Sequence, residues 1–123
     1  MRMSFIGRQP TSILLPRRDG REITLLSLAN HTSGLPPSDR MFSRFAPYPV
    51  ERMHAFLSST QLTSAPGDSY RYSNLGAALL GQALAARAGK TYEELVVDRV
   101  CGPLRMASTR VTMTDADRSR FAV

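Results

Sequence analysis

The chain has 123 residues, 42% of them hydrophobic, and carries a formal net charge of +6. This length suits one globular domain at most, in which folding buries roughly two-thirds of the surface of the unfolded chain. The basic residues are scattered from Arg2 to Arg120 without a run beyond Arg17-Arg18, whereas a nucleic-acid-binding domain gathers them on one face among aromatic residues. We therefore expect a solvated basic surface and no nucleic-acid partner.

The cysteine count and the apolar runs argue against an internal disulfide and a membrane span. Cys101 is the only cysteine, so the chain cannot form an internal disulfide, and we expect this side chain to be a small buried apolar group. The longest apolar run, 75–86, is interrupted by Gln82 and is too short to span a bilayer. Residues 1–8 lack the long apolar stretch of a signal peptide. The sequence thus predicts no membrane span, and it leaves the localisation open.

Little regular structure is predicted before a first short helix. Residues 1–12 show no periodicity and carry no assignment. The apolar run 13–15 is expected to be extended, and the sequence Arg-Arg-Asp-Gly at 17–20 is expected to turn. Thr24 can cap a helix over 25–30, in which apolar side chains share one face.

A loop and a second helix follow. Gly34 and two prolines force a loop over 31–37. An irregular stretch over 38–48 is expected to pack three apolar side chains inward: Met41, Phe42 and Phe45. The next helix begins at Pro49, and four apolar residues recur at helical spacing along it: Val50, Met53, Phe56 and Leu57. His54 lies on this helix with no second ligand three or four residues away, so we assign it no chemistry.

The longest predicted helix covers 75–88 and contains small residues that would let another element approach closely. Gly89 is expected to end it, since glycine readily adopts the positive φ found at a helix C-terminus. Thr91 and Glu94 then have the spacing of a capping box, in which each side chain binds a free backbone N–H at the start of a helix. That helix is predicted to end near Cys101.

A polar tip is predicted between a tight turn and the 75–88 helix. Pro66-Gly67 breaks the chain, and the triplet Tyr72-Ser73-Asn74 follows. In a short non-helical segment residues i and i+2 point the same way, which places the Tyr72 phenol beside the Asn74 carboxamide. A phenol can transfer a proton and a carboxamide can orient a carbonyl, so these two side chains are candidate site residues.

Three blocks of sequence resemble the class C β-lactamase family, which includes D-Ala-D-Ala carboxypeptidases, D-aminopeptidases and related serine esterases. The tip resembles the family's Tyr-x-Asn segment, and 31–36 resembles its His-Thr-Ser-Gly-Leu-Pro loop. Residues 103–106, with Thr109, resemble its Pro-Leu-Gly-Met block and the threonine that follows. Tyr-x-Asn alone is a weak pattern, but three blocks in the right order and spacing are specific.

The resemblance implies a mainly α chain that forms the helical lobe of a β-lactamase/transpeptidase-like fold, with the mixed α/β lobe missing. The partial family domain would cover 13–112. It would follow the unassigned segment 1–12 and precede an uncommitted tail over 113–123. Residues 109–112 are expected to be extended.

Members of this family work by acyl transfer through a serine in a Ser-x-x-Lys motif. The resemblance gives Tyr72 a catalytic role: with that lysine it helps to take the proton of the serine and later passes it to the leaving group. A free phenol has a pKa of about 10, which nearby ammonium groups lower. Asn74 would bind the amide carbonyl of the substrate, and a Lys-Thr-Gly strand would help to form the oxyanion hole. Neither a metal nor a cofactor is implied.

Two of these motifs are absent from the chain. Ser-x-x-Lys needs a serine three residues before a lysine, and Arg87 occupies that position before Lys90. The triplet 90–92 has tyrosine where Lys-Thr-Gly has glycine, and it lies between two predicted helices rather than on a strand. Residues 1–123 alone are therefore expected to be inactive, as a fragment of an enzyme that binds its small-molecule or peptide substrate only when complete.

The candidate residues also have structural interpretations. Tyr72 could be a packing residue, and Asn74 could simply cap the following helix. We interpret Ser73 as a spacer, because no general base is identifiable next to it. Tyr70 is interpreted as a core residue.

Other interpretations concern the 31–37 loop and the chain as a whole. A Ser-His-Asp triad of His31, Ser33 and Asp39 is disfavoured, because such short separations rarely give triad geometry. The loop is instead expected to support the site. A non-catalytic chain, either a decayed remnant or a helical interaction module, is the alternative to an enzyme fragment. Exposed apolar surface on the 50–57 and 75–88 helices predicts self-association. The sequence does not distinguish β-lactam, ester, peptide and amide substrates.

Overall fold

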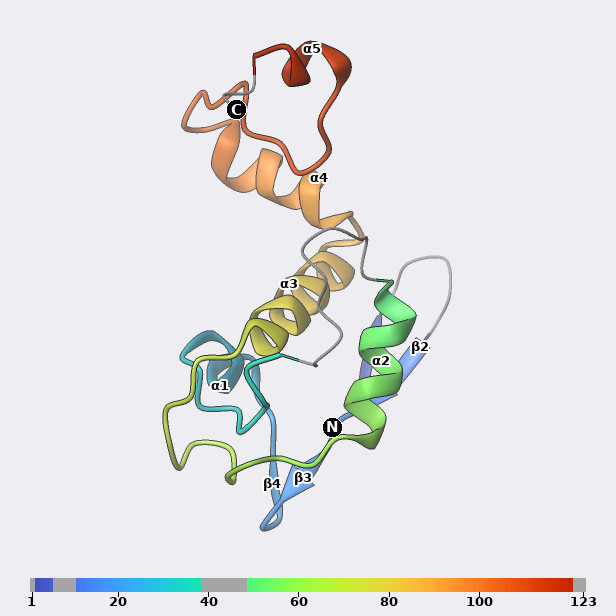
Figure 1. The fold of residues 1–123 in the computed structure, drawn as a ribbon, viewed down its shortest axis with the longest axis vertical. Helices are drawn as coiled ribbons and strands as arrows, with labels where there is room; N and C mark the ends of the chain where they lie inside the picture. The colour runs from blue at the N-terminus through green and yellow to red at the C-terminus, as the bar shows by residue number, and fades with distance from the viewer. Residues whose placement is uncertain (1, 6–10, 39–48, 121–123) are drawn as a thin grey trace.

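Two antiparallel hairpins open the computed structural model, which describes residues 2–5, 11–38 and 49–120 (Figure 1). The strands are β1 (Arg2–Phe5), β2 (Thr11–Leu14), β3 (Arg17–Arg18) and β4 (Arg21–Glu22). Strand β1 pairs with β2, and β3 pairs with β4 across the predicted turn. The unassigned segment 1–12 thus contains a strand. Strand β1 forms by pairing with β2, with Arg2 opposite Leu14. Such pairing does not require a periodic pattern of apolar residues within the strand itself.

The helices of the described residues are α1 (Leu25–Ala29), α2 (Val50–Ser59), α3 (Asn74–Ala88), α4 (Tyr92–Val96), the π-helical turn η1 (Val97–Cys101) and α5 (Asp115–Arg118). They confirm the helices predicted over 25–30, 50–57 and 75–88, each within two residues. None of these helices is both long and apolar enough to cross a membrane. The residues expected to pack inward between α1 and α2 lie outside the described residues: Met41, Phe42 and Phe45.

Side-chain caps set several helix boundaries. Thr24 Oγ1 accepts a hydrogen bond from the Ser27 N–H at 3.0 Å, which confirms the predicted cap of α1. Thr91 Oγ1 accepts from the Glu94 N–H at 3.2 Å, and the Glu94 carboxylate accepts from the Thr91 N–H at 2.7 Å. This capping box is the predicted one, and the bond from the Thr91 N–H holds the pKa of Glu94 below its ordinary value. Gly89 ends α3 with a φ of 64°.

One apolar core joins α1, α2, α3 and the strands in the lower half of Figure 1. On α2, Met53 and Leu57 are 2% and 0% exposed, and Val50 and Phe56 are partly buried. Full burial of such a side chain contributes about 1.5–3 kcal/mol. The core also contains Ile13, Leu15, Ile23, Leu28, Leu35, Leu62, Leu75 and Leu79. The expectation that α2 and α3 expose their apolar faces is therefore wrong for these side chains, which pack against one another.

Elements α4 and η1 extend away from this core (Figure 1). At the junction, a methyl group added to Gly81 would come within 3.1 Å of the Tyr92 ring, so the glycine lets α4 approach α3 closely. The helix predicted to reach Cys101 ends instead in the π-helical turn η1. There the Gly102 N–H donates to Val97 O at 2.8 Å, and the next residue is a proline, which has no N–H to continue the helix. Cys101 is buried, as predicted.

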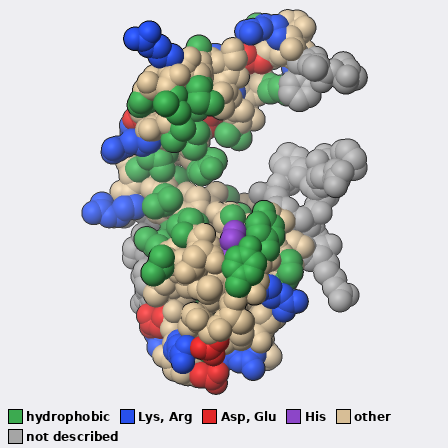
Figure 2. Space-filling view, turned by 90° about the vertical axis from the view of Figure 1, so that its left-hand side faces the viewer, with side chains coloured by type: hydrophobic (Ala, Val, Ile, Leu, Met, Phe, Trp, Pro, Cys, Tyr) green, Lys and Arg blue, Asp and Glu red, His purple; other side chains and the backbone are tan. Residues whose placement is uncertain are grey.

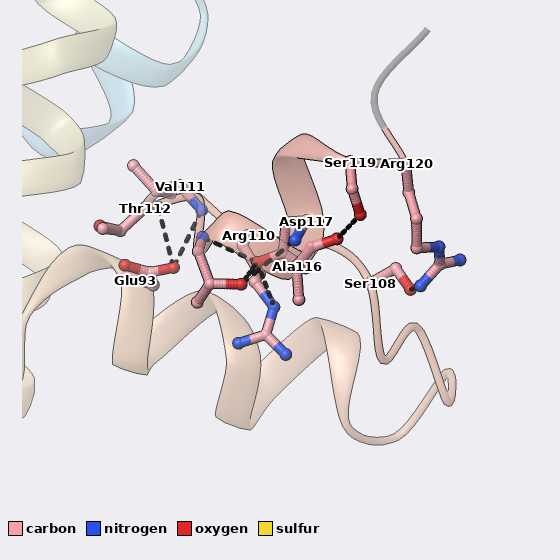
Figure 3. Close-up of polar contacts among 10 residues, drawn as sticks. Glu93, Ser108, Arg110, Val111, Thr112, Ala116, Asp117, Ser119 and Arg120 are labelled. Atoms are coloured by element: carbon pink, nitrogen blue, oxygen red, sulfur yellow. Dashed lines mark hydrogen bonds and ion pairs between the residues drawn. The ribbon is translucent and has the colours of Figure 1, made fainter.

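The C-terminal segment is attached to α4 through the Glu93 carboxylate (Figure 3). The N–H groups of Val111 and Thr112 donate to Glu93 Oε1 at 3.0 and 3.1 Å. These bonds, chiefly the one from Thr112, hold the pKa of Glu93 below its ordinary value. Residues 109–112, expected to be extended, pair with no strand, and two of their N–H groups bind the Glu93 side chain. Helix α5 lies in the tail that carried no assignment.

Exposed apolar side chains gather on the C-terminal elements. Figure 2 shows hydrophobic side chains spread over the upper part of one face of the molecule, among basic groups. Exposed apolar residues between η1 and α5 are Val97, Val100, Leu104, Met106, Val111 and Met113. We call this set the C-terminal apolar surface. Contiguous apolar patches larger than a few hundred Å² are rare on soluble monomers.

We expect residues 1–123 to self-associate through the C-terminal apolar surface. Sedimentation velocity should show oligomers that grow with protein concentration. Replacing Val100 and Leu104 together with lysine should shift the chain toward monomer, because it places two charges on that surface. The control is Leu14→Lys, which changes a side chain on β2 that is at least as exposed as Val100 and Leu104. A monodisperse wild-type monomer with a sharp, reversible melt would contradict this expectation.

Candidate active site

The two candidate side chains of the tip are hydrogen-bonded to each other. Tyr72 Oη donates to Asn74 Oδ1 at 3.1 Å. Both residues are exposed, Tyr72 by 56%. The prediction that these side chains lie next to each other is confirmed. The bond uses the amide oxygen, so the two N–H donors of Nδ2 take no part in it. The tip can therefore offer a phenol and amide donors to a molecule bound beside it.

Ser73 is a structural residue with two hydrogen bonds, rather than a spacer. It caps α3, since its Oγ accepts from the Gly76 N–H at 2.9 Å, and it donates to Pro36 O at 2.7 Å. Its side chain is 1% exposed. Because Ser73 supplies the cap, Asn74 is released from that role and its side chain can turn to Tyr72. With its proton given to a carbonyl, Ser73 is not an activated nucleophile.

The loop over 31–37 supports the tip through hydrogen bonds to its backbone, as expected. Asn74 N–H donates to Pro37 O at 2.8 Å, and Arg71 N–H donates to His31 O at 2.8 Å. Between them, the Ser73 N–H donates to His31 Nδ1 at 3.3 Å. These bonds fix the backbone on both sides of Tyr72.

The hydrogen bonds within this loop do not build a Ser-His-Asp triad. His31 Nδ1 accepts from the Ser73 backbone, and the buried Ser33 Oγ accepts from the Leu35 N–H at 3.4 Å. Asp39 lies outside the described residues. Both side chains therefore serve the backbone of the loop and the tip.

Gly34 anchors the loop to the segment before the Pro-Gly turn. Its φ is +75°, and a methyl group added there would lie 2.2 Å from Ser64 O. Gly34 O accepts hydrogen bonds from both the N–H and the hydroxyl of Thr63, at 2.8 and 3.0 Å. A side chain at this position would separate the loop from 62–64, so the glycine is required by close contact as well as by its φ.

Tyr70 is not a core residue. It is 69% exposed, because residues two apart in an extended segment point the same way and Tyr72 faces solvent. Its ring meets that of His31 edge to face, with centroids 5.9 Å apart. The ring of Tyr72 lies 4.6 Å from that of His31 at 41°. The imidazole is thus in contact with both tyrosines, an arrangement that the sequence analysis missed.

Other candidate groups lie away from the tip. Lys90 pairs with Asp98, and Thr91 caps α4, so the triplet 90–92 lies at the junction of α3 and α4 and not on a strand, as predicted. A hollow of about 350 Å³ beside η1 contains neither Tyr72 nor Asn74 in its lining. No cluster of three or more His, Cys, Asp or Glu side chains suited to a metal occurs within 2–5, 11–38 and 49–120.

Comparison with known proteins gives relatives over most of the chain. The sequence profile of the Beta-lactamase family matches residues 9–123. The D-alanyl-D-alanine-carboxypeptidase/endopeptidase AmpH of Escherichia coli K12 is 37% identical over 118 residues, which cover 93% of this chain and 31% of AmpH. Beta-lactamase-like protein 2 of Dictyostelium discoideum is 37% identical over 92 residues, covering 70% of this chain and 16% of that protein. The chain thus spans no more than about a third of these relatives.

Solved structures agree with the sequence relatives. A β-lactamase/D-alanine carboxypeptidase from Yersinia pestis, in complex with citrate, superposes with a TM-score of 0.82 at 34% identity, over 93% of this chain and 34% of the other. A class C β-lactamase shares the fold, with a TM-score of 0.67 at 23% identity over 85% of this chain and 29% of the other. The family profile and these relatives lead to one conclusion: the chain belongs to the β-lactamase family.

Proposed function

We propose that this chain is the helical lobe of a serine hydrolase that cleaves D-alanyl peptides by acyl transfer. Two relatives above 30% identity over 93% of the chain carry D-alanine carboxypeptidase in their names, the second together with β-lactamase, whereas structures named only as class C β-lactamases are at 23–24%. The lobe would extend over about 13–112. The nucleophilic serine, its lysine and the Lys-Thr-Gly strand would come from the remaining two-thirds of the fold.

The hydrogen bond from Tyr72 to Asn74 is the observation that carries this proposal. In the complete enzyme, ammonium groups of the other lobe would lower the pKa of the Tyr72 phenol, so that it can take the proton of the serine and return it to the leaving group. Asn74, which lies beside Tyr72, would donate from Nδ2 to the carbonyl of the substrate. The amide N–H of Asn74 would thus hold the substrate carbonyl close to the Tyr72 hydroxyl, which transfers the proton.

A chimera with AmpH tests the proposal. This chain would replace the region of E. coli AmpH with which it aligns, about 118 positions. We expect the chimera to release D-alanine from a peptide that ends in D-Ala-D-Ala, measured against AmpH itself. A folded chimera that binds a fluorescent penicillin but releases no D-alanine would overturn the substrate class. A folded chimera with neither property would support a non-catalytic chain.

Residues 1–123 alone are expected to be inactive, because they contain no Ser-x-x-Lys. Incubation with a penicillin or an activated ester should leave the intact mass unchanged. The matched positive control is the chimera, which should gain the mass of one acyl group. Stoichiometric labelling of a serine in the isolated chain would show that the nucleophile lies within it, and the lobe assignment would then fail.

A further inference from the structure

His31 has a strained backbone that places its ring against the tip. Its φ is +60°, in the left-handed region that few residues other than glycine adopt, although histidine and asparagine do so more often than most. The ring lies 4.6 Å from that of Tyr72 and 5.9 Å from that of Tyr70. An uncommon backbone conformation thus holds an imidazole in contact with the ring of an exposed tyrosine.

The hydrogen bonds of His31 fix its tautomer. The Ser73 N–H donates to Nδ1 at 3.3 Å, so Nδ1 holds a lone pair and the proton of the neutral ring is on Nε2. The carbonyl of the same residue accepts from the Arg71 N–H at 2.8 Å. One residue therefore holds the backbone immediately before and after Tyr72 and also contacts its ring.

We propose that His31 is a positioning residue for Tyr72. Its ring limits the rotation of the exposed tyrosine, and its Nδ1 and carbonyl fix the backbone from which the phenol extends. Together they hold Tyr72 Oη within hydrogen-bonding distance of Asn74 Oδ1. The value of this geometry for catalysis rests on the proposed function, whereas the geometry itself does not.

Two substitutions separate the contributions of the ring and the acceptor. His31→Asn keeps a side-chain acceptor and a residue type that tolerates positive φ, but removes the ring. His31→Phe keeps a ring and removes the acceptor. Tyr70→Phe is the matched control, because it keeps the ring that meets His31 edge to face and changes only a hydroxyl.

Nuclear magnetic resonance of residues 1–123 with labelled histidine and tyrosine tests the proposal, in solution or by magic-angle spinning if the chain assembles. We expect the His31 ring to carry its proton on Nε2, with ring-to-ring contacts to Tyr72. In His31→Asn the Tyr72 χ1 couplings should average toward those of a free tyrosine, a change that loss of the imidazole ring current alone does not produce, while the Ser73 amide signal stays close to its wild-type position. In His31→Phe the Ser73 amide should move instead. Tyr70→Phe should leave both signals in place.

Three results would overturn the inference: a wild-type His31 protonated on Nδ1, a Tyr72 ring that is unchanged in His31→Asn, or loss of the helical circular dichroism in that variant. The last would assign His31 to folding of the loop rather than to Tyr72. An inactive chimera with the expected resonance signature would overturn the proposed function and leave this inference intact. An active chimera in which the Tyr72 ring rotates freely beside His31 would overturn this inference and leave the proposed function intact.

Discussion

Tyr72→Phe in the AmpH chimera is expected to lower kcat/KM by about 10²–10⁴-fold, the usual contribution of proton transfer by a positioned side chain. The substitution removes the hydroxyl that donates to Asn74 and keeps the ring that lies against His31. Folding should therefore be preserved, as checked by circular dichroism. Release of D-alanine, followed over a range of substrate concentrations, gives kcat and KM separately.

Tyr70→Phe in the same chimera is the control for this prediction. Tyr70 is two residues away and similarly exposed, and the substitution again removes only a phenolic hydroxyl. We expect its kcat/KM to stay within about twofold of the unsubstituted chimera, since even a tenfold change would require about 1.4 kcal/mol. Equal, small effects from both substitutions would show that the catalytic role of Tyr72 is wrong.

Gly34→Ala is expected to destabilise residues 1–123 by roughly 2–5 kcal/mol, the sum of a left-handed backbone cost and of overpacking. The added methyl group would lie 2.2 Å from Ser64 O, a backbone atom that moves only if its segment moves. Domains of this size are stable by only about 5–15 kcal/mol, so much of the stability would be lost. Urea denaturation followed by circular dichroism measures the free energy of unfolding.

Gly20→Ala separates the two costs in Gly34→Ala. Gly20 has nearly the same φ, +72°, but a methyl group there meets no atom within 4 Å. Its substitution should cost only the backbone term, about 1–2 kcal/mol. If the two variants lose the same stability, the contact between Gly34 and Ser64 is relieved by a small movement, and the close approach of the loop to 62–64 is not what requires glycine.

Helices and their caps could be predicted because their signals are local. The Thr91 and Glu94 capping box and the Gly89 terminus are encoded within a few residues, and the structure has both. Strand β1 could not be predicted, because it is formed by a partner strand and not by its own pattern. The same holds for the attachment of 109–112, which depends on Glu93, about 18 residues earlier.

At the site, the i and i+2 spacing predicted that Tyr72 and Asn74 lie together, since this too is a local property. The roles of Ser73 and His31 could not be predicted from this spacing. The hydroxyl of Ser73 reaches a carbonyl 37 residues earlier, and its N–H reaches an imidazole 42 residues earlier. The motif at 31–36 thus identifies the loop correctly. Its support of the tip, however, depends on contacts between segments that are far apart in the sequence.

The contacts of the tip also have a consequence for the order of folding during synthesis. Those between residues far apart in the sequence join 31–37 with 63–76, and the helix that follows ends at Ala88. A ribosome adds about 5–20 residues per second, so adding residues 92–123 takes roughly 2–6 s, whereas loops close within microseconds. The part of the chain that carries Tyr72 and Asn74 therefore leaves the ribosome before the C-terminal apolar surface does, so its contacts can close first.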